Sequence, residues 1–216
     1  MSSNSKIEKN KLLLVEGADE VGFFKAYLEA LKKDSIQIMQ YNGKDNLENH
    51  LSILRGIPNF EILDNLIIVV DCDDNLNNSI KGVNNSLIKN NFTKINKTFE
   101  FINCNKNDNL NIALLTIPEE NGALEDLCLS TLNKPHSDIL ELATQYIENI
   151  HSKYKTASRK RKAILHAYLS AFANKDKKGE RNNYAGATLG MASQRGAWDF
   201  SSIYMQPYTE FFDKIS

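Results

Sequence analysis

Two short apolar runs that end abruptly on acidic residues constrain the fold of this chain more than any other feature of its sequence. Residues 12–15 are followed by Glu16. Residues 67–70 are followed by Asp71 and then Asp73. A continuous apolar run of this length is typical of a parallel strand that is buried on both faces. Because ligand sites in open α/β sheets lie beyond the carboxyl ends of such strands, we expect these acids at one edge of a sheet.

Strand and helix patterns alternate through the first part of the chain. Strands are expected at residues 11–15, 36–41 and 66–70, with helices at residues 20–31 and 47–54 between them. In the helical segments apolar residues recur every three or four positions, as on the buried face of an amphipathic helix. Strand–helix–strand–helix–strand at this spacing predicts a parallel βαβαβ unit.

Helical patterns dominate the rest of the chain. We expect a helix within 77–91, strands at 99–102 and 112–117, and helices at 124–132, 139–154 and 159–173. The predicted fold class is therefore α/β, with a Rossmann-like parallel sheet flanked by helices and a helical C-terminal cap. Residues 1–120 would form the core, and residues 121–216 a helical extension packed on it in one compact unit. The C-terminal aromatic residues are expected to dock the end of the chain on this core.

The acids at the two strand ends favour a metal site. Asp71 and Asp73 are separated by one residue, so their side chains project to the same side of an extended backbone. Glu16 and Glu20 are four residues apart and share one face if a helix begins near Glu16. Carboxylates this close repel one another unless they are protonated or bridged by a cation. Their hard oxygen atoms suit Mg²⁺ or Mn²⁺.

These residues resemble the TOPRIM domain, which occurs in topoisomerases, primases, small maturation nucleases and overcoming-lysogenization-defect (OLD) nucleases. The resemblance lies in Val15-Glu16-Gly17 before a helix and in Asp71-x-Asp73 at the end of a later apolar strand. It implies a Rossmann-like fold in which one glutamate and an aspartate pair hold Mg²⁺ for phosphodiester chemistry. Over its full length the chain also resembles a small family of stand-alone TOPRIM-like proteins of unknown function.

The resemblance is closer to the OLD branch, which has a second acid one helical turn after the first and a Leu-Glu pair at a helix start. These features match Glu20 and Leu124-Glu125. A lysine before a glycine corresponds to Lys178. As a hypothesis, we place one metal ion on Glu16 and the aspartate pair and a second on Glu20 and Glu125, with charge neutralisation at the phosphate by Lys178.

Simpler structural roles remain open for several of these residues. Glu20 and Glu125 would also suit the first turn of a helix, where an acidic side chain complements the helix dipole. A basic run could contact phosphates of a nucleic acid, or it could form a solvated helix face. That run consists of Arg159, Lys160, Arg161 and Lys162.

Bulk composition excludes several classes of protein. Charges nearly balance, with 26 Lys and Arg against 27 Asp and Glu, so any basic surface must be local. The cysteines are scattered without a CxxC pair and the histidines lack ligand spacing, which argues against a disulfide framework and a zinc site. No apolar run approaches the ~20 residues that span a bilayer. We expect a soluble cytoplasmic protein.

The leading functional interpretation is a divalent-metal-dependent nuclease, or a related phosphodiester-cleaving enzyme, that acts on DNA or RNA with one or two Mg²⁺ or Mn²⁺ ions. The alternative is a non-catalytic TOPRIM-like interaction or regulatory module in phage defence or mobile-element biology. A third interpretation is a Rossmann-like binder of small molecules. Nucleic acid is the expected partner, and a separate ATPase chain would be another, because OLD nucleases usually carry an ATPase domain.

Overall fold

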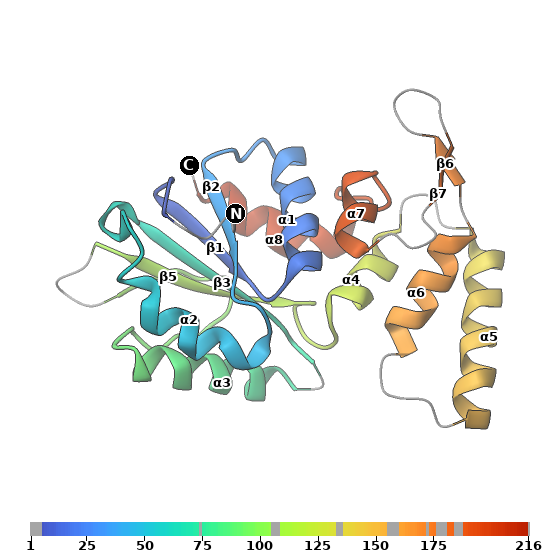
Figure 1. Ribbon diagram of the computed structural model, residues 1–216, viewed down its shortest axis with the longest axis horizontal. Helices are drawn as coiled ribbons and strands as arrows, with labels where there is room; N and C mark the ends of the chain where they lie inside the picture. The colour runs from blue at the N-terminus through green and yellow to red at the C-terminus, as the bar shows by residue number, and fades with distance from the viewer. Residues whose placement is uncertain are drawn as a thin grey trace.

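A five-stranded, mostly parallel sheet forms the centre of the molecule in the computed structural model (Figure 1). The structure describes residues 6–73, 75–104, 109–132, 136–154, 160–171, 173–175, 181–183 and 188–215. The strand order is β2-β1-β3-β5-β4, in which only β4 is antiparallel to its neighbour. The strands are β1 (Lys11–Val15), β2 (Ile36–Gln40), β3 (Asn65–Asp71), β4 (Ile102–Asn103) and β5 (Asn111–Ile117). The predicted α/β fold class with a flanked parallel sheet is confirmed.

Helices cover both faces of this sheet, which explains why its central strands are continuous apolar runs. Alternate residues of one strand enter different cores: Leu13 belongs to one hydrophobic cluster and Leu14 to the other. On one face lie α1 (Ala18–Ala30) and α8 (Gln206–Asp213), and on the other α2 (Leu47–Leu54) and α3 (Leu76–Lys89) (Figure 1). Burial on both faces is what distinguishes such strands from the alternating strands of a half-exposed sheet.

The α1 face of the sheet also carries α7 (Leu189–Gln194), which packs very closely on α1. A Cβ atom added to Gly190 would lie 3.0 Å from the Cα of Gly22, and one added to Gly22 would overlap the backbone of Gly190. Two glycines therefore allow the two backbones to touch.

The C-terminal aromatic residues dock the end of the chain on the sheet, as predicted. The buried hydroxyl of Tyr208 on α8 donates a hydrogen bond of 2.8 Å to the carbonyl of Thr116 on β5. Tyr27 on α1 shares a 2.9 Å hydrogen bond with Thr209. Trp198 is 3% exposed and donates to Ser193 Oγ at 2.6 Å.

The remaining helices and strands lie outside the central sheet. Figure 1 shows α5 and α6 as an antiparallel pair that projects away from the sheet, joined to it through α4. These elements are α4 (Leu124–Ser130), α5 (Ser137–Tyr154), α6 (Lys160–Ser170), β6 (Ala173–Lys175) and β7 (Arg181–Asn183). Short 3-10 turns are η1 (Lys44–Asn46), η2 (Phe60–Ile62) and η3 (Ile203–Met205). Among the described residues, no helix is both long and apolar enough to span a membrane.

One predicted strand is shorter than expected, and one pair of strands was not predicted. The strand expected at residues 99–102 is reduced to Ile102–Asn103. Phe99 has a φ of +58°, a left-handed conformation that interrupts an extended strand. The polar stretch after α6, for which no strand was predicted, contains the paired strands β6 and β7. The pairing is between two polar segments, so hydrophobic alternation gave no indication of it.

Candidate functional site

The predicted acids meet at the carboxyl edge of the sheet. Glu16 follows the last residue of β1, and Asp71 is the last residue of the adjacent strand β3. Glu20 lies in the first turn of α1 and Glu125 in the first turn of α4. The parallel pairing of the two strands therefore brings acids from separate parts of the sequence to one place.

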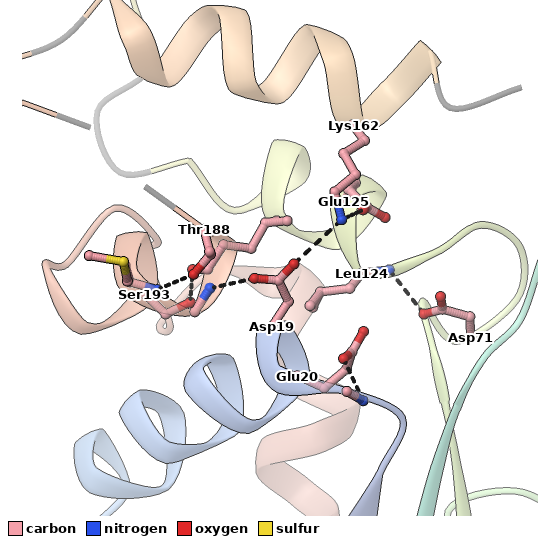
Figure 2. Close-up of polar contacts among 12 residues, drawn as sticks. Asp19, Glu20, Asp71, Leu124, Glu125, Lys162, Thr188 and Ser193 are labelled. Carbon is pink, nitrogen blue, oxygen red and sulfur yellow. Dashed lines mark hydrogen bonds and ion pairs between the residues drawn. The ribbon is translucent and has the colours of Figure 1, made fainter. Parts of the chain in front are cut away.

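Asp71 is the centre of this acidic cluster. Its Oδ1 accepts a hydrogen bond of 3.1 Å from the backbone N–H of Leu124, which opens α4 (Figure 2). Burial of the carboxyl, together with the nearby charges of Glu20, Glu16 and Glu125, raises the pKa of Asp71 to about 8. A carboxyl in this setting resists ionisation unless positive charge is brought to it.

The pKa values of Glu16 and Glu20 are also raised, so the ionised forms of both side chains are disfavoured. Burial is the largest cause of the raised pKa of Glu16, and the backbone N–H of Lys44 opposes it by donating to that carboxylate. Burial also raises the pKa of Glu20, with a further contribution from Glu16. The Glu20 carboxylate accepts from the backbone N–H of Gly17 at 2.9 Å, so it closes the first turn of α1 (Figure 2). The helix-capping role considered for Glu20 is therefore present, in a side chain that also faces the acidic cluster.

Asp73 departs from the geometry expected of an extended strand end. Its φ is +52°, a left-handed conformation that aspartate tolerates better than most residues. Its backbone forms a two-hydrogen-bond bridge with Gly122, with N···O distances of 2.7 and 2.8 Å. Its carboxylate forms an ion pair with Lys44, which raises the pKa of that lysine. The expectation that Asp71 and Asp73 project from one straight strand is wrong, because the chain turns at Asp73 to reach Gly122.

Lys162 on α6 reaches into the opposite side of the cluster (Figure 2). Its Nζ lies 3.2 Å from Glu125 Oε1 and 3.4 Å from Asp19 Oδ2. The other oxygen of Asp19 accepts from the backbone N–H of Gly190 at 3.3 Å. Burial lowers the pKa of Lys162, but the two acids outweigh that effect and raise it. Sequence reasoning placed this lysine in a basic run and missed its position between two acids, which depends on how α6 packs.

The described members of the basic run make ion pairs within the chain. Lys160 Nζ lies 2.8 Å from Glu148 Oε1. Arg161 Nε lies 3.0 Å from Asp126 Oδ1. Arg159 lies outside the described residues, so the structure places Lys160, Arg161 and Lys162. The run stands on a helix whose positive side chains turn toward acids of α4 and α5.

The acidic cluster has the type of ligand atoms that a divalent cation binds, but its side chains are not arranged around a common ion position. Carboxylate oxygens are the ligands that Mg²⁺ and Mn²⁺ prefer. Within the part of the chain that the structure describes, however, no group of three or more His, Cys, Asp or Glu side chains is arranged to hold a metal ion. Two of the predicted ligands, Asp73 and Glu125, are paired with Lys44 and Lys162 instead. Lys178, predicted to act on the phosphate, lies outside the described residues.

Comparison with known proteins gives a family and one similar structure. The structure is the C-terminal region of the Burkholderia pseudomallei OLD protein, with a TM-score of 0.46 and 11% sequence identity. The similarity covers 97% of this chain and all of that region. No curated protein matched the chain. Residues 10–216 match a family described as "Protein of unknown function (DUF3226)". The chain belongs to the DUF3226 family, in agreement with the resemblance to a small family of unknown function.

Proposed function

We propose that this protein is a TOPRIM-type nuclease, a divalent-metal-dependent enzyme that cleaves phosphodiester bonds in DNA or RNA. The observation that carries the proposal is the set of like charges around Asp71. Glu16, Glu20 and Glu125 all approach this carboxyl closely enough to raise its pKa. One unit of pKa corresponds to about 1.4 kcal/mol, so the arrangement is costly in the absence of a counter-charge. Strongly perturbed groups of this kind are typical of functional sites.

Mg²⁺ or Mn²⁺ would supply that counter-charge. Glu16, Asp71 and Asp73 would hold one ion, with Glu20 and Glu125 available to a second. A bound ion of this type lowers the pKa of a water molecule and stabilises the oxygen that leaves the phosphorus.

The chain itself contributes positioning groups to this site. The N–H of Leu124 holds one oxygen of Asp71, and no described residue donates a hydrogen bond to the other oxygen. The Glu20 carboxylate is fixed by the N–H of Gly17. The ion pairs of Lys44 and Lys162 hold these acids less strongly, because an ion pair of two long, partly exposed side chains is worth at most about 1 kcal/mol. Metal binding at Asp73 and Glu125 would therefore displace these lysines at a modest cost.

The proposed contacts with nucleic acid come from basic side chains. In this proposal Lys178 neutralises charge on the phosphate, and the run from Arg159 to Lys162 contacts the backbone of the substrate. Lys160 and Arg161 form ion pairs with acids of the same chain. We therefore expect their contribution to the affinity for nucleic acid to be small and to fall as the salt concentration rises.

The test is cleavage of labelled single- and double-stranded DNA and RNA with Mn²⁺, with and without a chelator. We expect Asp71→Asn, Glu20→Gln and Glu125→Gln to lose at least 100-fold in rate while the circular dichroism spectrum stays unchanged, on the scale of lost electrostatic stabilisation in active sites. Glu29→Gln, on an exposed part of α1, is the matched control and should keep full activity. Wild-type protein that cuts none of these substrates would contradict the proposal.

A second candidate function is a non-catalytic interaction or regulatory module. The ion pairs Lys44–Asp73 and Lys162–Glu125 favour it, because they neutralise part of the acidic cluster without metal. This candidate predicts a folded protein that cleaves no nucleic acid at any Mn²⁺ concentration, and in which Glu20→Gln alters only stability.

A further inference from the structure

A cavity of about 290 Å³ opens beside the acidic cluster, on the α2 and α3 side of the sheet. Glu16 and Asp71 form part of its wall, so it shares two side chains with the proposed catalytic site. The rest of the wall comes from η1, α2, the end of β3 and α3. Its other lining residues are Tyr41, Lys44, Asp45, Leu47, Glu48, Val70, Asn78, Ser79, Gly82, Val83 and Ser86. The volume is close to the lower limit of the ~300–1,000 Å³ typical of small-molecule sites, so it suits one small group.

The lining combines apolar walls with polar groups along the edge. Leu47, Val70 and Val83 offer aliphatic surface. Asn78 and Ser86 on α3 offer both hydrogen-bond donors and acceptors. A heteroaromatic ring with two apolar faces and a polar edge is the kind of group that such a lining accepts. Enzymes that bind a base outside its stack use pockets of the same character.

The charges of the lining exclude a phosphate from the interior. Asp45 and Glu48 add two further carboxylates to Glu16 and Asp71, whereas Lys44 is the one basic residue among the lining residues. Lys44 is engaged with Asp73, and Glu48 with Lys89 at 2.8 Å. A phosphate would be repelled from this lining. A neutral group with N–H donors would instead be attracted to its carboxylate oxygens.

Gly82 is the second observation that points to an occupant. It lies in the middle of α3, where glycine costs about 1 kcal/mol relative to alanine. Nothing lies within 4 Å of a Cβ added at this position, so no close contact requires the glycine. Its backbone φ is not in the left-handed region that favours glycine either. The missing side chain leaves the wall of the cavity open at this point.

We propose that this cavity receives one nucleobase of the substrate, from the nucleotide next to the phosphate that is cleaved. The proposal rests on the proposed nuclease function for the identity of the ligand. The phosphate stays outside, at the edge marked by Glu16 and Asp71, while the base enters between α2 and α3. The carboxylates of Asp45 and Glu48 favour adenine, cytosine and guanine, which carry an amino group, over uracil and thymine.

The test measures binding of adenosine monophosphate by amide chemical shifts in a chelator, where cleavage is absent. Shifts are expected at the amides of Asn78, Gly82 and Ser86. Ribose 5-phosphate, which lacks the base, should not produce them, and uridine monophosphate should bind at least threefold more weakly. Equal shifts from ribose 5-phosphate would overturn the base pocket.

Substitutions on α3 separate loss of the cavity from loss of the fold. A Cβ atom at Gly82 meets nothing within 4 Å, so Gly82→Leu is expected to extend into the opening and to weaken adenosine monophosphate binding at least tenfold. Gly82→Ala should raise the melting temperature and weaken binding less. Asn85→Leu adds the same side chain at an exposed position of α3 outside the cavity, and should bind as the wild type does. Unchanged binding by Gly82→Leu would overturn the proposal.

Cleavage assays on the same variants keep this proposal distinct from the nuclease proposal. Wild-type and Gly82→Leu protein that cleave oligonucleotides at equal rates would overturn the base pocket and leave the nuclease intact. Alternatively, the wild-type protein could bind adenosine monophosphate in a base-dependent way, lose this binding on Gly82→Leu, and cleave no substrate. That result would support the base pocket and overturn the nuclease proposal.

Discussion

Lys162 Nζ lies 3.2 Å from Glu125 Oε1 and joins α6 to the first turn of α4 (Figure 2). The glutamate side chain is only 17% exposed, and the same ammonium group also approaches Asp19. The positive charge of Lys162 therefore occupies the place beside Glu125 that a metal ion bound to this glutamate would take. This lysine and the proposed second metal ion compete for the same carboxylate.

We predict that Lys162→Gln raises the affinity of the protein for Mn²⁺, because Glu125 loses its competing cation. Without metal the variant should be less stable by about 1 kcal/mol, since Asp19 and Glu125 both lose their ion pair with this lysine. Isothermal titration calorimetry and urea unfolding measure the two effects. Lys160→Gln, which breaks the ion pair with Glu148 on α5, is the control and should leave Mn²⁺ affinity unchanged. Equal Mn²⁺ affinity in the Lys162 variant and the wild type would contradict the competition.

The raised pKa of Asp71 predicts that stability falls as pH increases. The folded carboxyl has a pKa of about 8 against an ordinary value of 3.8. Between these values the folded protein retains a proton that the unfolded chain has released, so the free energy of unfolding decreases as pH rises through this window. Asp71→Asn should remove this dependence. At about pH 8.5 the variant should exceed the wild type by more than ~1.4 kcal/mol, the worth of one pKa unit.

Urea unfolding at a series of pH values checks this prediction. The difference between Asp71→Asn and the wild type should be small at about pH 5 and should grow toward alkaline pH. Asp34→Asn, at an exposed position in the turn before β2, is the control and should follow the wild type. A difference that is independent of pH would show that Asp71 ionises normally.

The two helical glycines Gly22 and Gly82 should respond in opposite directions to the same substitution. Gly22→Ala forces its Cβ onto the backbone of Gly190, and overpacking of this kind costs about 1–3 kcal/mol. Gly82→Ala meets nothing within 4 Å and should stabilise α3 by about 0.5–1 kcal/mol. Thermal unfolding of both variants measures the contrast. A stabilised Gly22→Ala variant would mean that α1 and α7 do not touch as described.

The parts of this molecule that the sequence predicts are those that depend on local pattern. The apolar runs of β1 and β3 predict buried parallel strands, and their pairing places Glu16 beside Asp71. Glu20 and Glu125 could be placed at helix starts from periodicity alone. Each of these inferences needs only the spacing of apolar residues along a strand or helix and the rule that parallel strands end at a common edge.

The parts that escaped prediction depend on contacts between distant segments. Lys162 reaches Asp19 across 143 positions of sequence, and no local pattern encodes that meeting. Lys44 similarly reaches Asp73 from a turn after β2. The turn at Asp73 arises from its bridge to Gly122, so the strand period fails there. These long-range ion pairs determine which acids are available to a metal ion.

A crystal structure of the protein soaked in Mn²⁺, with the ions located by anomalous scattering, tests the central claim most directly. The account predicts a Mn²⁺ ion bound to Asp71 and Glu16, with Lys44 moved away from Asp73. At higher Mn²⁺ concentration it predicts a second ion at Glu20 and Glu125, with Lys162 displaced. No anomalous peak within bonding distance of Asp71, with both lysines still paired to their acids, would contradict it.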